Sequence, residues 1–481
     1  MKKTLFKISL FVFFSLTLYS QSTHWQRYFP RGNDEEGYDI CTASDGNIYT
    51  GGLTSDPRCG WLLKLNPYGD TIWTKRISQF DFIFAIEPTS DGGCIVAGDY
   101  NYVVKVNMNG DTIWTSAING GNICGITKTN DGNYIVCGGS FNPTPFACKI
   151  NETGVIIWQK DYSQINGGFY YTVINGIDNG YIFVGVASTP LYRGIIVKID
   201  YNGNYLWQKQ FMLNDTATYL RSIVTKHNGY LIAGTTGTYN YRRVFLIESN
   251  LMGDTINSRI FNSNVEEINP CLLKINENKY YLSNDNNPYS NTKIKIRSID
   301  TNYQILNQLI INPIRDYVSC QKIGLYTGDN SGDLLLTGIT DYFNVMNEEL
   351  YAARIDSSLT QPPGIGIRSI SSEIPNSFLL SQNYPNPFNP TTKIRFSLPY
   401  PSEGRVQSVK LIIYDMLGKE IAELIPPLWG GQGGLKPGTY EVTWDASNFP
   451  SGVYFYKLTA GDPSLRSGQG FTESKKMILI K

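Results

Sequence analysis

The chain has 481 residues, of which 41% are hydrophobic and 17% are charged, and its 41 basic side chains balance 41 acidic ones. This length exceeds one ordinary domain, and the apolar content is ample for packed cores. A net charge of zero excludes the basic surface that nucleic-acid binding requires, so we expect no nucleic-acid partner.

Residues 1–22 have the pattern of a secretory signal peptide. Lys2, Lys3 and Lys7 precede an apolar run at 8–18, and the small residues Ser20 and Ser22 offer cleavage positions. The apolar run is too short to cross a bilayer comfortably, and no later segment approaches the required length. We therefore expect Sec-dependent export and no transmembrane segment in the mature chain.

A pattern of 40 to 50 residues recurs between residues 23 and 356. Each copy has a short apolar run, a turn such as Asp45-Gly46, a strand rich in Val, Ile and Gly, a third strand, and a fourth strand. The third strand ends in Lys, an apolar residue and Asn or Asp, and the fourth strand carries a Trp in the earlier copies. The spacings between Trp73, Trp114, Trp158 and Trp207 are 41, 44 and 49 residues. Such a period, with four strands per copy, is typical of a β-propeller.

Seven copies predict an all-β fold with a seven-bladed propeller over 23–356, and six or eight blades are the alternatives. HWQRYF at 24–29 is similar to the fourth strand WTKRI at 73–77, whereas the seventh copy lacks such a strand. We therefore expect the strand of Trp25 to complete the last blade and close the ring, which removes exposed sheet edges. The G-x-x-x-W ending of the copies resembles quinoprotein-like and WD40-like propeller repeats. We expect the repeated Trp residues to pack blade against blade: Trp25, Trp73, Trp114, Trp158 and Trp207.

The eight cysteines follow no regular spacing and include no CxxC pair, so a zinc site is not expected. Buried free thiols are the first interpretation. In an exported chain they could instead form disulfides, and Cys137 and Cys148, on adjacent predicted strands of one blade, are the first pair to consider.

Residues 357–376 are rich in Ser, Pro, Gly and Ile without periodicity, which predicts a linker. Alternating strands then begin near Lys393, Val409, Thr439 and Val453, and a last strand ends the chain. These strands predict a small β-sandwich.

The C-terminal motifs are NYPNPFNPTTKIRFSLP, LIIYDMLGKEIAEL, LKPGTYEVTWDASNFPSGVYFYKLTAG and ESKKMILIK. Over 377–481 they resemble the type A C-terminal sorting domain of type IX secretion substrates. The resemblance implies an immunoglobulin-like fold and recognition by the outer-membrane secretion machinery. It also implies removal by a sortase-like protease, followed by release or attachment to the cell surface. The matching motif positions are Gly438, Tyr440, Asp445, Gly452, Tyr454, Lys475, Lys476 and Lys481. Insertions around 426–434 and 462–471 depart from the pattern and concern loop length.

Candidate chemistry in the repeat region is sparse. There are two histidines and no HExxH motif or nucleophile elbow, and we expect no cofactor. The segments starting at Asn107 and Asp200 are similar to the front half of a calcium loop but lack its final Glu, so turn formation explains them better. Asp39 and Glu87 lie on predicted inner strands, where paired carboxylates could act on a glycoside.

These observations favour a secreted or surface-attached binding protein with a glycan or protein ligand. A carbohydrate-active enzyme is the alternative, and a purely structural role in the cell envelope comes third. Carboxylates clustered at one mouth of the channel would favour the enzyme. An aromatic or polar mouth, for which the 33 Tyr residues offer material, would favour binding.

Overall fold

The computed structural model describes residues 24–29, 34–55, 57–139, 144–162, 168–187, 192–213, 215–238, 241–286, 292–311, 317–342, 345–359, 366–371, 375–399, 409–425, 438–446, 449–460 and 471–481. The expected signal peptide and both expected insertions lie wholly or almost wholly outside these ranges. The regular structure of the described residues consists of strands, and they contain no helix that is long and apolar enough to span a bilayer.

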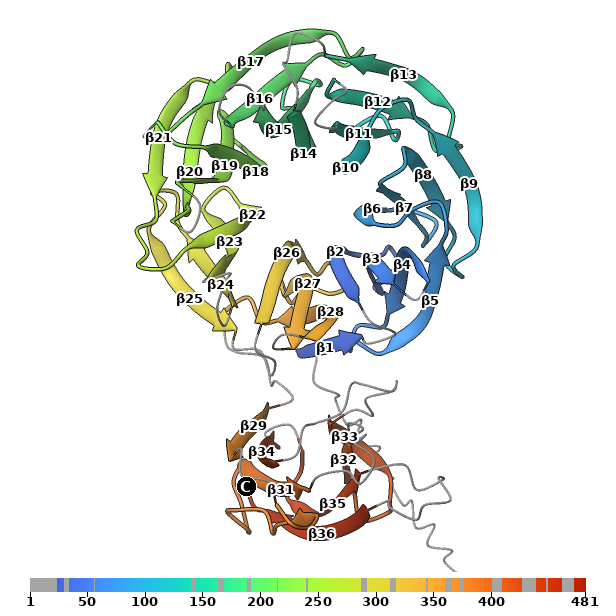
Figure 1. Cartoon of the computed structure of the whole chain (residues 1–481), viewed down its shortest axis with the longest axis vertical. Helices are drawn as coiled ribbons and strands as arrows, with labels where there is room; N and C mark the ends of the chain where they lie inside the picture. Colours follow the sequence, from blue (N-terminus) through green and yellow to red (C-terminus); the bar gives the residue numbers. More distant parts are fainter. Residues whose placement is uncertain are drawn as a thin grey trace, which may run out of the picture.

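Seven four-stranded antiparallel sheets form a ring, which confirms the predicted seven-bladed propeller (Figure 1). One strand of each blade faces the ring centre. These innermost strands are β2 (Glu35–Thr42), β6 (Ile83–Pro88), β10 (Asn122–Lys128), β14 (Gly168–Asn175), β18 (Thr218–Lys226), β22 (Glu267–Asn276) and β26 (Tyr317–Leu325). The second strands are β3 (Ile48–Ser55), β7 (Cys94–Gly98), β11 (Tyr134–Gly139), β15 (Tyr181–Ala187), β19 (Gly229–Thr236), β23 (Lys279–Asn286) and β27 (Leu334–Tyr342).

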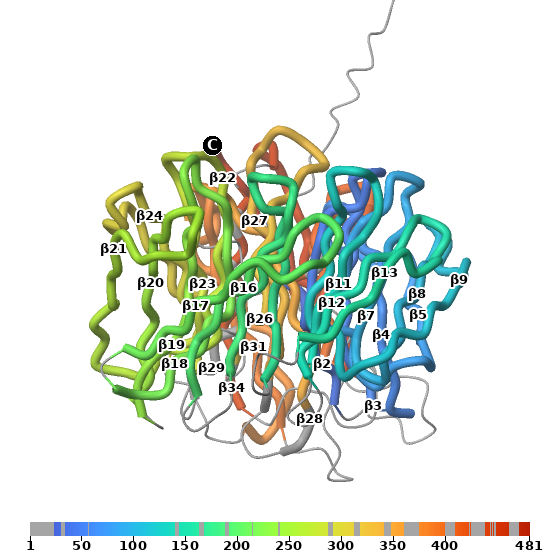
Figure 2. Tube along the Cα trace, turned by 90° about the horizontal axis from the view of Figure 1, so that it is seen from above, coloured from blue at the N-terminus to red at the C-terminus, as the bar shows by residue number. Residues whose placement is uncertain are grey.

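The two outer strands complete each blade. The third strands are β4 (Arg58–Leu65), β8 (Tyr102–Val106), β12 (Phe146–Ile150), β16 (Arg193–Ile199), β20 (Arg243–Asn250), β24 (Lys293–Ile299) and β28 (Val345–Ile355). The outermost strands are β5 (Thr71–Ile77), β9 (Thr112–Ala117), β13 (Ile156–Asp161), β17 (Tyr205–Phe211), β21 (Thr255–Ile260), β25 (Ile305–Ile311) and β1 (Trp25–Phe29). Seen from its edge in Figure 2, the ring has strands that run between its two faces.

The second and third strands are buried on both faces because each blade is packed between two neighbours. Every described side chain of β7, β11 and β15 is buried, which explains the continuous apolar runs in the sequence. The hydrophobic clusters accordingly lie between blades. One of them joins Tyr49 and Leu62 of the first blade to Val96 and Val104 of the second.

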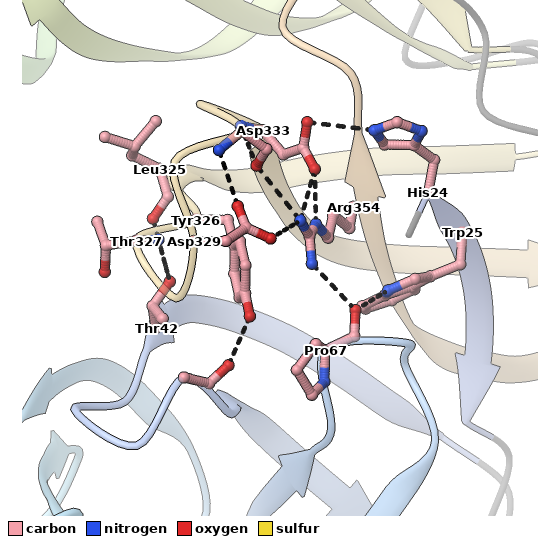
Figure 3. A network of polar contacts seen from close by, with 12 residues as sticks. His24, Trp25, Thr42, Pro67, Leu325, Tyr326, Thr327, Asp329, Asp333 and Arg354 are labelled. Atoms are coloured by element: carbon pink, nitrogen blue, oxygen red, sulfur yellow. Dashed lines mark hydrogen bonds and ion pairs between the residues drawn. The ribbon is translucent and has the colours of Figure 1, made fainter. Parts of the chain in front are cut away.

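The ring closes through the N-terminal strand, as predicted. β1 pairs with β28 in antiparallel register from Trp25↔Arg354 to Phe29↔Leu350. At this seam Arg354 donates to Asp333 and Asp329, each at 2.7 Å, and stacks over Tyr326 (Figure 3). Closure therefore combines a backbone ladder with ion pairs made by the buried Arg354 side chain.

The C-terminal residues form two four-stranded sheets around one hydrophobic core. The first sheet has the order β29 (Gly366–Ser371), β34 (Gly438–Asp445), β31 (Thr391–Leu398) and β30 (Leu379–Leu380). The second has the order β33 (Glu420–Ile425), β32 (Val409–Tyr414), β35 (Gly452–Ala460) and β36 (Phe471–Leu479). The core draws on both sheets, with Ile394 and Val442 from the first and Ile413 and Tyr456 from the second.

One expectation needs correction here. Residues 366–371 lie within the expected linker, yet they form β29, which pairs with β34 from Gly366↔Thr443 to Ser371↔Thr439. The pairing partner, rather than any local alternation of apolar residues, makes this segment a strand.

Candidate binding site in the central channel

Every innermost strand contains a break in register at the same point of the repeat. The pairing between the first and second strands of each blade skips one residue, or two in the sixth blade. The skipped residues are Tyr38, Phe84, Cys124, Tyr171, Arg221, Asn269 with Pro270, and Gln321. A bulge of this kind re-aims the side chain of the extra residue.

All of these bulge residues line a central cavity of about 600 Å³. All except Pro270 are only partly buried, whereas the residue before each bulge is buried in every blade except the sixth. The channel is therefore a solvent-accessible site whose wall receives one bulge from each blade. Its volume is within the range of small-molecule binding sites, about 300–1,000 Å³.

Aromatic rings cover one part of this wall. In the wall, Tyr38 meets Phe84 edge-on at 5.3 Å, and Phe84 stacks on Phe82, which lies outside the lining, with centroids 5.6 Å apart and planes inclined by 8°. Phe169 and Tyr171 form a second stacked pair at 6.4 Å and 17°. In each stacked pair the two rings are two residues apart in the chain, and the second ring belongs to the bulge residue at the register break.

Asp39 lies in the channel, as expected, but its oxygens are already occupied. Oδ2 accepts the N–H of Ile86 in the next blade at 2.8 Å, and Oδ1 accepts the N–H of Ile40 at 2.9 Å. The Lys322 ammonium lies 3.5 Å from Oδ1, and this negative charge raises the pKa of Lys322. Ser222 occupies the same repeat position and accepts the N–H of Leu272 at 3.0 Å. Asp39 therefore links two blades in the way that Ser222 does.

Glu87 is the second carboxylate in the lining. Burial, reinforced by the charge of Asp39 and opposed by a hydrogen bond from the Lys128 backbone, raises the pKa of Glu87 to about 7. Among the described lining residues, Asp39 and Glu87 are the only carboxylates. Glu87 could exchange a proton near neutral pH, whereas Asp39 is engaged by two N–H groups and a lysine.

The repeated Trp residues contact the blade that follows. The indole N–H groups of Trp25, Trp73 and Trp114 donate at 3.0 Å to the carbonyls of Pro67, Met108 and Glu152. The rings lie over glycines with positive φ in the turns of the next blade: Trp25 over Gly69, Trp73 over Gly110, Trp114 over Gly154, Trp158 over Gly203 and Trp207 over Gly253. A Cβ at Gly203 would lie 2.8 Å from the Trp158 ring. These turns thus need glycine for the contact as well as for the backbone conformation.

A second contact that recurs in the repeat was not among the predicted features. The Lys of the third strand reaches the Asp of the first turn, and the Lys64, Lys149 and Lys198 side chains are almost fully buried in doing so. In the fifth blade the charges are exchanged, since Glu248 takes the Lys position and pairs with Lys226. The recurrence, in the first four copies, of Asp in the first turn and Lys near the end of the third strand was the available signal. The pairs are Lys64–Asp45, Lys105–Asp91, Lys149–Asp131, Lys198–Asp178 and Lys226–Glu248.

The calcium-like segments form turns. The Oδ1 atom of Asn107 accepts the N–H groups of Asn109 and Asp111, both at 2.9 Å, and Asp200 does the same for Asn202 and Asn204. In the part of the chain that the structure describes, no cluster of three or more His, Cys, Asp or Glu side chains could hold a metal ion.

All eight cysteines are free thiols. Cys137 lies opposite Ala147 in the ladder, so Cys148 is one residue out of register and points to the other face of the blade. Cys137 accordingly packs in the cluster of the fourth blade and Cys148 in the cluster of the second. A disulfide between them is therefore excluded by geometry.

The sorting-motif residues fall into two groups. Tyr440 stacks on Phe396 at 5.5 Å, and Tyr454 is 3% exposed and donates to the Pro450 carbonyl at 2.7 Å, so both belong to the core. Gly438 and Gly452 begin β34 and β35, and Asp445 ends β34 with a side chain outside the described residues.

The lysines of the sorting motif lie on the surface. Lys475 and Lys476 are on β36, the edge strand of the second sheet, where Lys475 pairs with Glu473 at 2.9 Å. The Lys481 N–H donates to Ser451 at 2.9 Å. These positions are accessible to a partner, whereas Tyr440 and Tyr454 are not.

The architecture defines a class: an exported seven-bladed propeller that carries a C-terminal sorting domain. Residues 382–467 match the family model described as the secretion system C-terminal sorting domain. This match, together with the preceding propeller, identifies a type IX secretion substrate that is released or attached to the cell surface. No curated protein matches the chain.

Solved propellers are similar only in fold. The WD40 β-propeller domain of Doa1 is 13% identical, with a TM-score of 0.47, over 67% of this chain and 94% of that one. The Cps50 (Swd1) propeller of Myceliophteria thermophila is 9% identical, with a TM-score of 0.47, over 68% and 98%. The WD40 repeats of RRP9 are 8% identical, with a TM-score of 0.49, over 68% and 97%.

Proposed function

We propose that the protein is a secreted or surface-attached binding protein whose central channel holds the ligand. Sec machinery exports the chain through the signal peptide at 1–22. The type IX machinery then recognises the C-terminal domain, and a sortase-like protease removes it. The observation that carries the binding function is the ring of bulges, in which each of the seven blades presents at least one bulge side chain to one accessible cavity.

The hydrogen bonding of the channel carboxylates favours binding over catalysis. The ligand-facing wall is mainly aromatic and polar, and one of the two lining carboxylates is engaged in linking blades. The enzyme alternative rests on one observation, the raised pKa of Glu87 near Asp39. In that case Glu87 would act as the acid on a glycosidic oxygen.

The test exposes the secreted protein to immobilised polysaccharides and measures retention and released reducing ends together. Retention without products is the expected result. If new reducing ends are released and Glu87→Gln abolishes this release, the function is glycoside hydrolysis and not binding alone. Absence of both retention and products across the polysaccharides would overturn a glycan-binding channel.

A further inference from the structure

Arg221 is the bulge residue of the fifth blade, and the fourth blade holds it at two points. The hydroxyl of Thr172 donates to the Arg221 carbonyl at 2.9 Å, which fixes the backbone. The guanidinium carbon lies 4.1 Å from the centre of the Tyr171 ring, which fixes the side chain. Two consecutive residues of one blade therefore orient a single arginine of the next.

The charge of Arg221 has no acidic counterpart among the described residues. No Asp or Glu in those ranges forms an ion pair or a hydrogen bond with its guanidinium, whereas the other lining cation, Lys322, is paired with Asp39. Glu87, on the second blade, is held partly protonated near neutral pH by burial. The channel therefore has an excess of positive charge at Arg221, at a position where a ligand can enter.

The surroundings of Arg221 restrict the shape of the anion. The Phe169–Tyr171 stack and the ring of Phe84 offer flat apolar faces, and Asn122 and Gln321 supply amide groups to the same cavity. A sugar ring has one apolar C–H face that stacks on an aromatic ring and hydroxyl groups that bind amides. A carboxylate on that ring would match the planar fork of a guanidinium.

An extended peptide fits this site less well. One recurring way for an extended peptide to bind is to add a strand to an exposed sheet edge. Here a bulge interrupts the free edge of every innermost strand, so no described edge in the channel offers a continuous ladder.

We propose that the channel binds the acidic sugar units of a polysaccharide, with the sugar carboxylate on Arg221 and the ring against the Phe169–Tyr171 stack. This inference rests on the proposed function and names its ligand class. No covalent step is involved.

The experiment titrates the full-length protein with an oligogalacturonate, a neutral galactose oligomer of the same length, and an acidic peptide. The variants are Arg221→Ala, Arg221→Lys and the matched control Arg243→Ala, which removes an exposed arginine of β20 outside the cavity lining. Circular dichroism and thermal midpoints establish that each variant is folded.

We expect the oligogalacturonate to bind more tightly than the neutral oligomer and to weaken with added salt. Arg221→Ala should lower its affinity roughly 10- to 100-fold, because a charge-assisted bidentate contact is lost. Arg221→Lys should recover part of this loss, and Arg243→Ala should bind as the unmodified protein does.

Equal affinity for both oligomers, unaffected by Arg221→Ala, would overturn the acidic-sugar assignment and leave the binding function intact. Tighter, Arg221-dependent binding of the acidic peptide would overturn it in favour of a protein ligand. If none of the three probes binds, the assignment is wrong, and a negative result on the wider set of immobilised polysaccharides would then also overturn the proposed function.

Discussion

Replacement of Trp25 by alanine tests how the ring is closed. The Trp25 side chain is 2% exposed, donates to the Pro67 carbonyl and covers Gly69, and its strand pairs with the last blade without a connecting hairpin. Truncation of a buried tryptophan costs about 3–5 kcal/mol in unfolding free energy. For a domain of this size we expect the propeller transition to fall by roughly 4–7 °C.

Calorimetry of the full chain measures this effect with two internal comparisons. Trp73→Ala removes the same type of contact from a half-buried position within a continuous blade, so it should cost less. Ile72→Ala changes a side chain that is 49% exposed and should leave the transition within about 1 °C. If Trp25→Ala shifted the propeller transition no more than Ile72→Ala does, closure through β1 would not be a source of stability.

Three further changes test the repeat and the channel. Gly203→Ala should cost more stability than Gly132→Ala by about 1–3 kcal/mol, because both glycines have positive φ but only Gly203 lies under an indole ring. Asp131→Asn should cost about 1–3 kcal/mol in chemical denaturation, since it leaves the buried Lys149 ammonium without its partner. The pKa of Glu87 is raised on folding, so its stabilising contribution is complete below about pH 4.5 and is lost as the pH rises through about 7. Unfolding free energy should therefore fall over this window by about 1–3 kcal/mol, and less in Glu87→Gln.

Each expectation has an outcome that contradicts it. Equal losses for the two glycine variants would show that the indole contact is unimportant. Asp111→Asn affects an exposed ion pair with Lys75 and should lower the unfolding free energy by less than about 1 kcal/mol. An equally small loss for Asp131→Asn would show that the Lys149–Asp131 pair does not stabilise the blade. Burial also raises the pKa of Asp285 to about 7, so the unfolding free energy of Glu87→Gln should still fall with pH, but by less. A fall as large as in the unmodified protein would show that Glu87 does not cause it.

Local sequence was enough to predict the blades and their order. The period of the Trp residues, the turns and the continuous apolar strands all depend on neighbours along the chain. Even ring closure followed from one similarity, that between the strand of Trp25 and the strand of Trp73.

The channel wall could not be predicted in this way. Whether Tyr171 or Arg221 faces the channel depends on a register break between two strands, which is set by hydrogen bonds and not by residue type. Aligning the copies on the aliphatic residue two positions further on, such as Val173 and Ile223, would have placed the bulge residues in one column. The residues in that column differ in chemical type from copy to copy, and this variety was the available signal that they face a binding site.

Contacts between distant segments account for the other features that the sequence did not reveal. Asp39 looked like a candidate acid because its partner Lys322 is 283 residues away. Residues 366–371 looked like a linker because their partner strand begins at Gly438.

The order of elements along the chain has a consequence for quality control during export. The blade that receives the first strand is built from β26, β27 and β28, which are among the last parts of the propeller to be synthesised. The sorting domain, matched at 382–467, comes after them. A chain truncated before residue 345 would leave the ring open and would also lack the sorting domain. Every chain that the secretion machinery can recognise therefore contains all the strands needed to close the propeller.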